Sequence, residues 1–442
     1  MLIPLHGIGS RHDLPLPFSF VLAGAGAALL VSFVVLIYAW RRPRFGSGGG
    51  RELPRLTAAL RRPGVGWAAR LLVLALYAWV GLALAGGEDR LTNPVFGFVY
   101  VWMWVGLVPV SLLLGPFWRA TNPLRTLHRG LCVLARVDPE EGVLTLPVRL
   151  GVWPAALGAF GFAWLELVQP DRTTLSVLRL WAAAWLVVLI VGAVVFGSRW
   201  IAAADVFEAY ATAVSQLSPV HWVDSRLRLI NPLAALTSWR APPGAVGLVA
   251  ALLGSTAFDS LQNTSWWIQT TQRSAVGPVP WSTAGLATVI VVVLVSFVLA
   301  ARWMGRYAGR PATAYPRLMA PSLVPIVVGY AVAHYATLLV VEGQRTAINL
   351  VDPLGRGWNL ARGLNMAGSA ATGVDTAIYA FPGLIAVIQL GAIVGGHLLG
   401  IVCAHELAVR ELPPGRMLAG QWPMVVVMIG YTTAGLVLLF SP

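Results

Sequence analysis

The chain of 442 residues is 57% hydrophobic and only 11% charged, and its mean hydropathy is +0.73. A soluble domain averages about 25% charged residues, so this composition excludes an ordinary soluble protein and indicates a polytopic membrane protein. The net charge of +13 comes from arginine alone, because the sequence contains no lysine. These arginines lie mainly between apolar segments, which favours a topological role and argues against a nucleic-acid partner.

Ten apolar segments follow one another along the chain, each roughly 16–23 residues long, and about 20 residues suffice to cross the hydrocarbon of a bilayer. They are predicted over 18–40, 71–86, 95–115, 151–169, 175–197, 244–260, 281–301, 322–342, 382–404 and 422–440. The first is too long for the apolar region of a signal peptide. The expected fold is therefore all-α: residues 1–442 form a single integral membrane helix bundle of about ten transmembrane helices, with the lipid bilayer as its partner.

Arginine is distributed unevenly over the loops between these segments. One set of alternate loops carries 23 arginines and the other side carries 8. The richer set comprises 41–70, 116–150, 198–243, 302–321 and 405–421. The positive-inside rule predicts that this set is cytoplasmic and that both termini lie outside. Residues 1–17 are then an extracytoplasmic tail, and residues 343–381 form a long extracytoplasmic loop.

Residues 200–217 lie inside one of the arginine-rich loops and have a helical pattern of their own. Their apolar side chains recur at helical spacing, at Phe207, Tyr210, Val214 and Leu217. An amphipathic helix of this kind favours the plane of the membrane surface. An interfacial cytoplasmic helix is therefore predicted here.

Two histidines, His334 and His397, fall inside apolar segments. An ionisable side chain in hydrocarbon is costly and is a functional candidate by default. At ~1.5 Å per residue their predicted depths differ by ~6 Å, so helix tilt could bring them together as a metal, haem or proton-relay site. The alternative is a packed helix whose histidines bond to a neighbouring carbonyl or tyrosine. His405 and Glu406 follow at the predicted cytoplasmic edge and are assigned to the end of the helix.

Three acidic residues lie near the predicted outer side. Glu166 and Asp259 fall close to the outer ends of their apolar segments, and Asp352 belongs to the long loop. If the helices that carry them are neighbours, these carboxylates could line a cavity that opens outward. The alternative is that they sit in interfacial water or pair with nearby arginines.

The N-terminal tail contains His6, His12 and Asp13. Imidazoles beside a carboxylate could bind copper or zinc, whereas the alternative is a tail without a ligand. Cys132 and Cys403 give neither metal-ligand spacing nor a disulfide framework. The sequence has no G-x-S-x-G, H-E-x-x-H, C-x-x-C or Walker motif. The cofactor therefore stays open, with a divalent metal or haem as the candidates.

Seven stretches form a distinctive set that runs in order over nearly the whole chain. They are HGIGSRHDLPLP, GPFWRATNPLRTL, VWPAALGAFGFAWLELV, STAFDSLQNTSWW, VPIVVGYAVAHYATLLVVEGQ, DPLGRGWNL and GGHLLGIVCAHELAV. With these stretches the chain resembles bacterial multi-pass membrane proteins that carry the label fenitrothion hydrolase.

The resemblance implies a location in the bacterial plasma membrane and the hydrolysis of an organophosphate triester, although the label names no catalytic residue. In that family the HG stretch follows a cleaved signal peptide and the last motif reads AHD. Here the chain begins five residues before His6, and Glu406 stands in place of the aspartate. That exchange keeps the carboxylate.

Three functions remain open at the level of sequence. The first is a membrane hydrolase, for which Asp259, His334, Asp352 and Glu166 and the tail residues could supply a base or metal ligands. The second is a transporter of a small molecule, with Glu166, Asp259, His334 and His397 along its pathway. The third is a redox or metal-handling module, with haem between two histidines or copper at the outer face.

Overall fold

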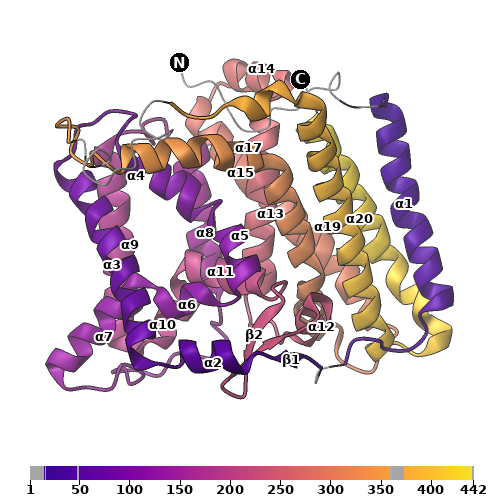
Figure 1. The fold of residues 1–442 in the computed structure, drawn as a ribbon. Helices are drawn as coiled ribbons and strands as arrows, with labels where there is room; N and C mark the ends of the chain where they lie inside the picture. The colour runs from indigo at the N-terminus through magenta and orange to yellow at the C-terminus, as the bar shows by residue number, and fades with distance from the viewer. Residues whose placement is uncertain (1–13, 15, 47–48, 359, 361–372, 441–442) are drawn as a thin grey trace.

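The structure, a computed structural model, describes residues 14, 16–46, 49–358, 360 and 373–440 as a bundle of helices (Figure 1). Within these residues, eight helices are long and apolar enough to cross a membrane. They are α1 (Phe18–Ala39), α3 (Pro63–Gly86), α9 (Leu175–Phe196), α13 (Ala245–Gln262), α15 (Pro278–Gly305), α17 (Val324–Asn349), α19 (Pro382–Glu411) and α20 (Met417–Leu439). This architecture indicates a multi-pass membrane protein, as the composition predicts.

The two other predicted spans have less regular structures. The segment predicted over 95–115 bends by 46° between its two halves. It consists of α4 (Pro94–Gly97), the π-helix η2 (Phe98–Met103) and α5 (Leu107–Leu114). Pro109 lies just after the bend and lacks the N–H of a continuous helix, which accounts for the break. The second is α8 (Trp153–Leu167), whose 15 residues extend only ~22 Å.

The five arginine-rich segments meet at one face, which is the lower face in Figure 1. The contacts that join them are Arg44 with Glu406, Arg228 with Glu52, Asn122 with Asp205, Arg310 with Glu411, and Arg410 with Thr237. At the opposite face Tyr100 donates to the carbonyl of Arg172, and the backbone N–H of Leu175 donates to Asp89. The cytoplasmic location of the lower face stays a prediction from the arginine distribution.

A small antiparallel sheet adds a β element to the helical fold at the lower face. Its strand order is β1 (Arg51–Glu52), β3 (Arg226–Leu229), β2 (Val220–Val223). The β2–β3 hairpin turns through Asp224 and Ser225, both at positive φ, as a tight two-residue hairpin requires. The sheet joins two loops that are far apart in the sequence. The two-residue strand β1 is too short to show the alternation of apolar residues that predicts a strand.

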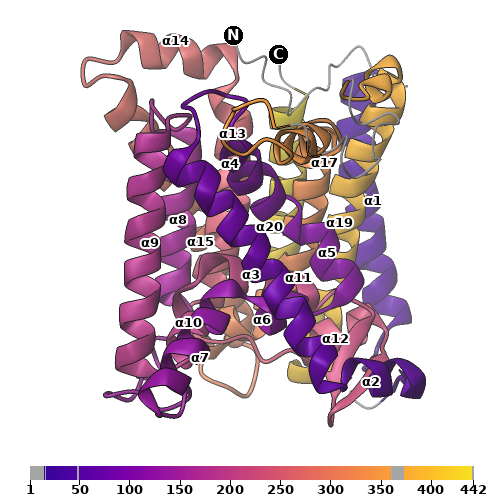
Figure 2. The same ribbon diagram turned by 60° about the vertical axis from the view of Figure 1, so that its left-hand side comes forward.

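Short helices fill the space between the long ones. At the lower face these are α2 (Pro54–Leu60), α6 (Phe117–Thr121), α7 (Pro123–Ala135), α10 (Arg199–Ala204), α11 (Val206–Ser215), α12 (Pro232–Ser238) and α16 (Tyr315–Met319). The 3-10 turns are η3 (Ala312–Ala314), η4 (Ala320–Leu323), η5 (Ala377–Ala380) and η6 (Pro414–Arg416). Helix α14 (Ser265–Arg273) lies across the upper face (Figure 2).

The interfacial helix predicted over 200–217 is instead the pair α10 and α11, and α11 is buried in the bundle. Nine of the ten α11 residues are buried, Glu208 among them, because its alanines let α5, α6 and α8 approach closely and its acidic groups find polar partners. The exposed amphipathic helix is α7, which turns Leu127, Leu131 and Leu134 outward. An outward apolar stripe of this kind suits a helix that lies against lipid.

The outer loop predicted over 343–381 begins later than expected, because α17 continues to Asn349. The indole of Trp102 donates to the carbonyl of Gly343, and the indole of Trp79 donates to that of Leu350. These bonds hold the end of α17 against α3 and η2. Most of the predicted tail, 1–17, lies outside the described residues.

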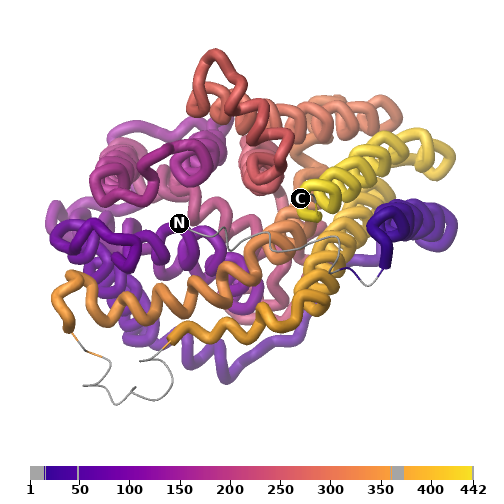
Figure 3. Tube along the Cα trace, turned by 90° about the horizontal axis from the view of Figure 1, so that it is seen from above, coloured from indigo at the N-terminus to yellow at the C-terminus, as the bar shows by residue number. Residues whose placement is uncertain are grey.

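The core of the bundle lies around α13, which is buried along most of its length. Helix α13 packs against α8, α15 and α17, and α17 packs closely against α19. Gly329 of α17 faces Gly396 of α19, and a Cβ on either glycine would collide with the backbone of the other helix. Seen from above, α1 stands at the edge of the bundle beside α20 and α19 (Figure 3).

Candidate functional site

A buried histidine–carboxylate pair links α13 to α17. The Nε2 of His334 lies 3.0 Å from Oδ2 of Asp259, and both side chains are about 1% exposed. The Tyr335 hydroxyl donates to the same oxygen over 2.9 Å, and the Gln262 amide donates to Oδ1 over 3.0 Å. The Asp259 carboxylate therefore accepts from three groups in an interior without bulk water.

The other nitrogen of His334 faces a hydroxyl pair. Its Nδ1 lies 3.2 Å from Oγ of Ser260, and that oxygen lies 3.1 Å from the Tyr330 hydroxyl. A ring that donates from Nε2 to Asp259 leaves Nδ1 to accept from Ser260. Helical spacing brings this network together, since Tyr330 and His334 are one turn apart on α17.

Glu166 approaches the same network from α8. Its half-buried carboxylate interacts electrostatically with Tyr335 and with Tyr100. Because Tyr335 bonds to Asp259, the structure gathers three of the residues nominated from the sequence, Asp259, His334 and Glu166. The predicted cavity that opens outward between these carboxylates stays a prediction, because Asp259 is buried and neither residue lines a cavity described here.

His397 does not meet His334. Its Nδ1 lies 2.9 Å from the carbonyl of Ile393, and its buried Nε2 makes no hydrogen bond to any described residue. Gly329 marks where α17 faces α19, and His334 lies five residues further on, ~7.5 Å along the axis and ~140° around it. His334 consequently faces α13. The two histidines predicted to share a site belong to different surroundings.

Asp352 has a structural role in the turn that follows α17. Its carboxylate accepts from the backbone N–H groups of Arg356 and Gly357 over 3.0 and 2.7 Å. It lies beside Glu88 and Asn93 at the upper face, in the lining of a cavity of about 140 Å³. The structure shows no bond between Asp352 and the network around His334 in the part of the chain that it describes.

The described residues do not form the predicted metal site or a haem site between His334 and His397. No three His, Cys, Asp or Glu side chains among them are arranged as metal ligands. Both nitrogens of His334 already have partners, which leaves none to ligate a haem iron. The proposed ligands His6, His12 and Asp13 lie outside the described residues.

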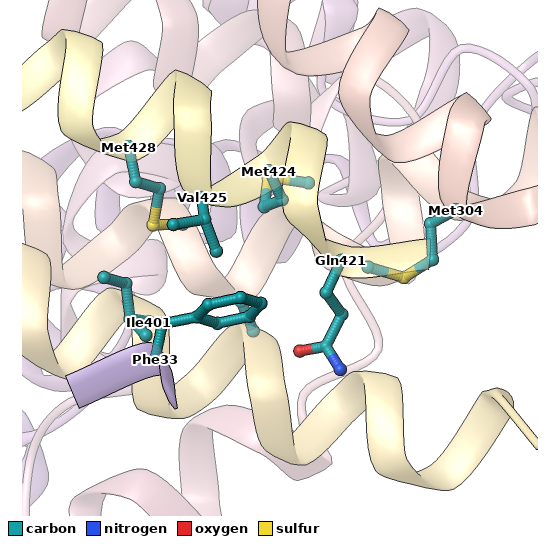
Figure 4. Close-up of a pocket in the computed structure, with 8 residues that line it drawn as sticks. Phe33, Met304, Ile401, Gln421, Met424, Val425 and Met428 are labelled. Carbon is teal, nitrogen blue, oxygen red and sulfur yellow. The ribbon is translucent and has the colours of Figure 1, made fainter. Parts of the chain in front are cut away.

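A methionine-lined cavity near the lower face also lacks the geometry of a metal site. It has a volume of about 10 Å³ and is lined by Met304, Met424, Met428 and Gln421, with apolar neighbours. Figure 4 shows Met304 and Met428 at opposite ends of this cavity, so their sulfur atoms do not converge. This cavity is a packing gap about the size of one water molecule.

Glu406, which sequence reasoning placed at a helix end, is a buried centre of hydrogen bonds. Its carboxylate is unexposed and accepts from the Trp40 indole, the backbone N–H groups of Arg44 and Phe45, and the Arg410 guanidinium. The four donors lie 2.9–3.1 Å away. Helix α19 continues to Glu411, so Glu406 is not at its end. In the sequence, only the spacing of four residues between Glu406 and Arg410 could have indicated that these two side chains form an ion pair.

His405 lies beside this centre and connects two other helices. Its Nε2 donates to the carbonyl of Trp40 over 2.9 Å, and its Nδ1 lies 3.0 Å from the amide of Gln421 on α20. His405 and Glu406 together fasten the end of α1 to α19 and α20. Their role is therefore to hold helices together.

A second acidic cluster lies at the start of α11 and was also missed. The amide of Asn122 donates to Asp205 over 2.8 Å and to Glu208 over 2.9 Å. Arg125 binds Glu208 with two hydrogen bonds of 2.7 and 2.6 Å. Asp205 and Glu208 fall inside the stretch 200–217 that was predicted to lie at the membrane surface, and its hydrophobic pattern gives no sign of their burial.

Asp205 gives an expected pH dependence, because it lies between α10 and α11, outside the long membrane helices. Burial, and then the Glu208 carboxylate, raise the pKa of Asp205 to about 7. An unfolded chain binds this proton only below about pH 4, so the folded protein binds more protons between pH 4 and 7, and stability falls as the pH rises through that range. We expect a lower melting temperature at pH 8 than at pH 6.

The Asp205→Asn variant is expected to reduce this difference between pH 6 and pH 8, since its side chain does not titrate. Thermal unfolding of the purified protein at both pH values measures it. Asp138→Asn, an exposed change near the same face, serves as the control. An unchanged pH dependence in Asp205→Asn would contradict the assignment.

Two cavities lie on either side of α11. The first, of about 10 Å³, is bordered by Tyr210, Thr256 and Tyr335 and has room for one water molecule. The second, of about 290 Å³, lies toward the lower face and is bordered by Arg119, Arg199 and Glu208. Tyr335 thus links the Asp259–His334 pair to the first of these cavities.

Comparison of the chain with protein-family models, with curated proteins and with solved structures gives no match.

Proposed function

We propose that this chain is a membrane transport protein of the bacterial plasma membrane that binds a proton at the Asp259–His334 pair. One observation supports this above the others: a histidine held between a carboxylate and a hydroxyl, fully buried where α13 packs against α17. An ionisable pair inside such a bundle is costly and is typical of ion and proton pathways.

The pair suits reversible proton binding. With the proton, the imidazolium and the carboxylate compensate each other; without it, the pair carries one uncompensated negative charge in a medium of low dielectric constant. The proton occupancy of the pair therefore responds to any charge that enters nearby. Glu166 interacts electrostatically with Tyr335, which bonds to Asp259. Tyr335, which donates to Asp259, and Tyr210 of α11 border the same water-sized cavity, and one water molecule there would connect them.

Proton flux into proteoliposomes tests the proposal. A pH-sensitive dye trapped inside the vesicles reports acidification when valinomycin and a potassium gradient impose a negative internal potential. We expect flux above that of protein-free vesicles, abolished in Asp259→Asn and His334→Gln. His397→Gln, a buried histidine outside the network, is the matched control and should keep the flux. Flux equal to that of empty vesicles, or equal in all variants, would reject the assignment.

A hydrolase remains the second candidate, because Ser260, His334 and Asp259 lie in the order nucleophile, base and carboxylate. In this mechanism Ser260 Oγ would attack the phosphorus of an organophosphate triester, His334 would take the hydroxyl proton, and an aryloxide would leave. Water would then release the phosphoryl group from the serine. The resemblance to proteins labelled fenitrothion hydrolase points to this substrate class.

Burial favours transport over hydrolysis, since Ser260 is 5% exposed and borders none of the cavities described above. The assay is release of nitrophenol from a nitrophenyl triester by the reconstituted protein. Release that Ser260→Ala abolishes would establish the hydrolase and displace the transport proposal. The transport proposal expects no release.

A further inference from the structure

The cavity of about 290 Å³ beneath α11 has a wall chemistry of its own. It lies between α6, α10, α11 and the first turns of α13. Small and apolar side chains form most of its wall, among them Ala209 and Ala213 of α11 and Ala245 of α13. Its volume is close to the lower end of the range for small-molecule pockets, about 300 Å³. The short alanine side chains of these helices leave this space.

The charged side chains that line the cavity have a net positive charge. Arg119 and Arg199 border it from α6 and α10, and both are exposed. Arg199 makes no hydrogen bond or ion pair with the described residues. Glu208 is the acidic group in the lining, but Arg125 binds its carboxylate through both oxygens, while Arg119 stands 4.0 Å away. Arg199 is therefore available to an anion, and the exposed Arg119, whose ion pair with Glu208 is the longer of the two, can turn toward one.

We propose that this cavity binds a compact amphipathic anion with a carboxylate or phosphate head and one short apolar chain. The head would meet Arg119 and Arg199, and the chain would pack against the alanines of α11 and α13. A small inorganic anion would leave the apolar wall without a partner. A neutral compound would leave both guanidinium groups unused, and a two-chain lipid exceeds the volume.

Calorimetric titration of the full chain in phosphatidylcholine nanodiscs tests this site, with protein-free nanodiscs subtracted. Octanoate and octyl phosphate are the anionic probes, and octanamide is the neutral probe of equal chain length. We expect saturable binding of one anion per chain and at least tenfold weaker binding of octanamide. Absence of saturable binding by either anion, or equal affinity for octanamide, overturns the proposal.

Variants separate the head group from the chain. Arg119→Gln combined with Arg199→Gln should weaken both anions about tenfold or more, and Ala202→Leu should weaken them by filling the cavity from half-buried Ala202. Arg129→Gln, on α7 outside this cavity, is the control for the loss of an arginine charge and should bind as the unmodified protein does. Unchanged affinity in both the double variant and Ala202→Leu overturns the site.

Two further measurements keep the result interpretable. Each variant must keep the elution volume and melting temperature of the unmodified protein; where Ala202→Leu does not fold, the double arginine variant decides. Native mass spectrometry that finds a two-chain anionic lipid displaced by octanoate would overturn the assignment to a free anion. Asp259→Asn should bind octanoate as the unmodified protein does. Failure of the anion-site proposal can therefore be distinguished from failure of the proton-transport proposal.

Discussion

Asp259→Ala is expected to lower the free energy of unfolding by about 3–5 kcal/mol, the usual cost of removing one partner from a buried ion pair. The substitution leaves His334, Tyr335 and Gln262 without their shared acceptor, and both Asp259 and His334 are about 1% exposed. Chemical unfolding of the detergent-solubilised protein, followed by tryptophan fluorescence, gives the difference. Asp259→Asn keeps an acceptor oxygen and should cost less, while still preventing proton binding.

Asp352→Ala is the control for this variant. Its carboxylate also accepts two hydrogen bonds, but from backbone groups in a turn at the protein surface, where water can replace it. We expect a loss below about 1 kcal/mol. Equal losses in Asp259→Ala and Asp352→Ala would show that the buried network adds no stability beyond that of a surface turn.

Glu406→Ala is expected to cost about 3 kcal/mol. The variant leaves the Trp40 indole and two backbone N–H groups without an acceptor. It also removes one acceptor of Arg410, which keeps its bonds to the carbonyls of Thr237 and Phe45. Each unsatisfied buried donor costs about 1–3 kcal/mol, and the total is discounted because Arg410 is 28% exposed and can turn to water. The unfolding midpoint measures the effect.

Limited proteolysis with trypsin at the lower face provides a second readout for Glu406→Ala, since cleavage after Arg41 or Arg44 should accelerate. Glu411→Ala removes a carboxylate from the same helix that pairs with a 61% exposed arginine, Arg310, and should cost less than about 1 kcal/mol. A Glu406→Ala variant as stable as Glu411→Ala would contradict the role assigned to Glu406.

The long helices could be predicted because hydropathy alone marks a segment that must cross hydrocarbon. The irregular elements could not. Helix α11 is too short and too rich in alanine for its hydrophobic pattern to indicate that it is buried. The sheet depends on pairing between strands in loops that are far apart in the sequence. The bent segment from α4 to α5 has the composition of a straight span, and its bend between Met103 and Leu107, just before Pro109, is a local backbone effect.

Asp259, Glu166 and His334 could be nominated because an ionisable side chain in an apolar segment is costly wherever it points. The partner of His334 could not be predicted. Because α17 is apolar around most of its circumference, its sequence does not indicate which face packs against which helix. His397 was predicted as its partner only because the two histidines lie at similar depths along their helices. The rotation that turns His334 toward α13 follows from the contact between Gly329 and Gly396.

The position of α1 bears on the order in which the protein is assembled. Its main neighbours are α19 and α20, and the bond from Trp40 to Glu406 spans 366 residues. During synthesis α1 is made long before α19 and α20, so it stays exposed to lipid or to the insertion machinery until these two partners arrive. Deleting α20 should therefore leave α1 open to quality-control proteases, even though the helices between them are present.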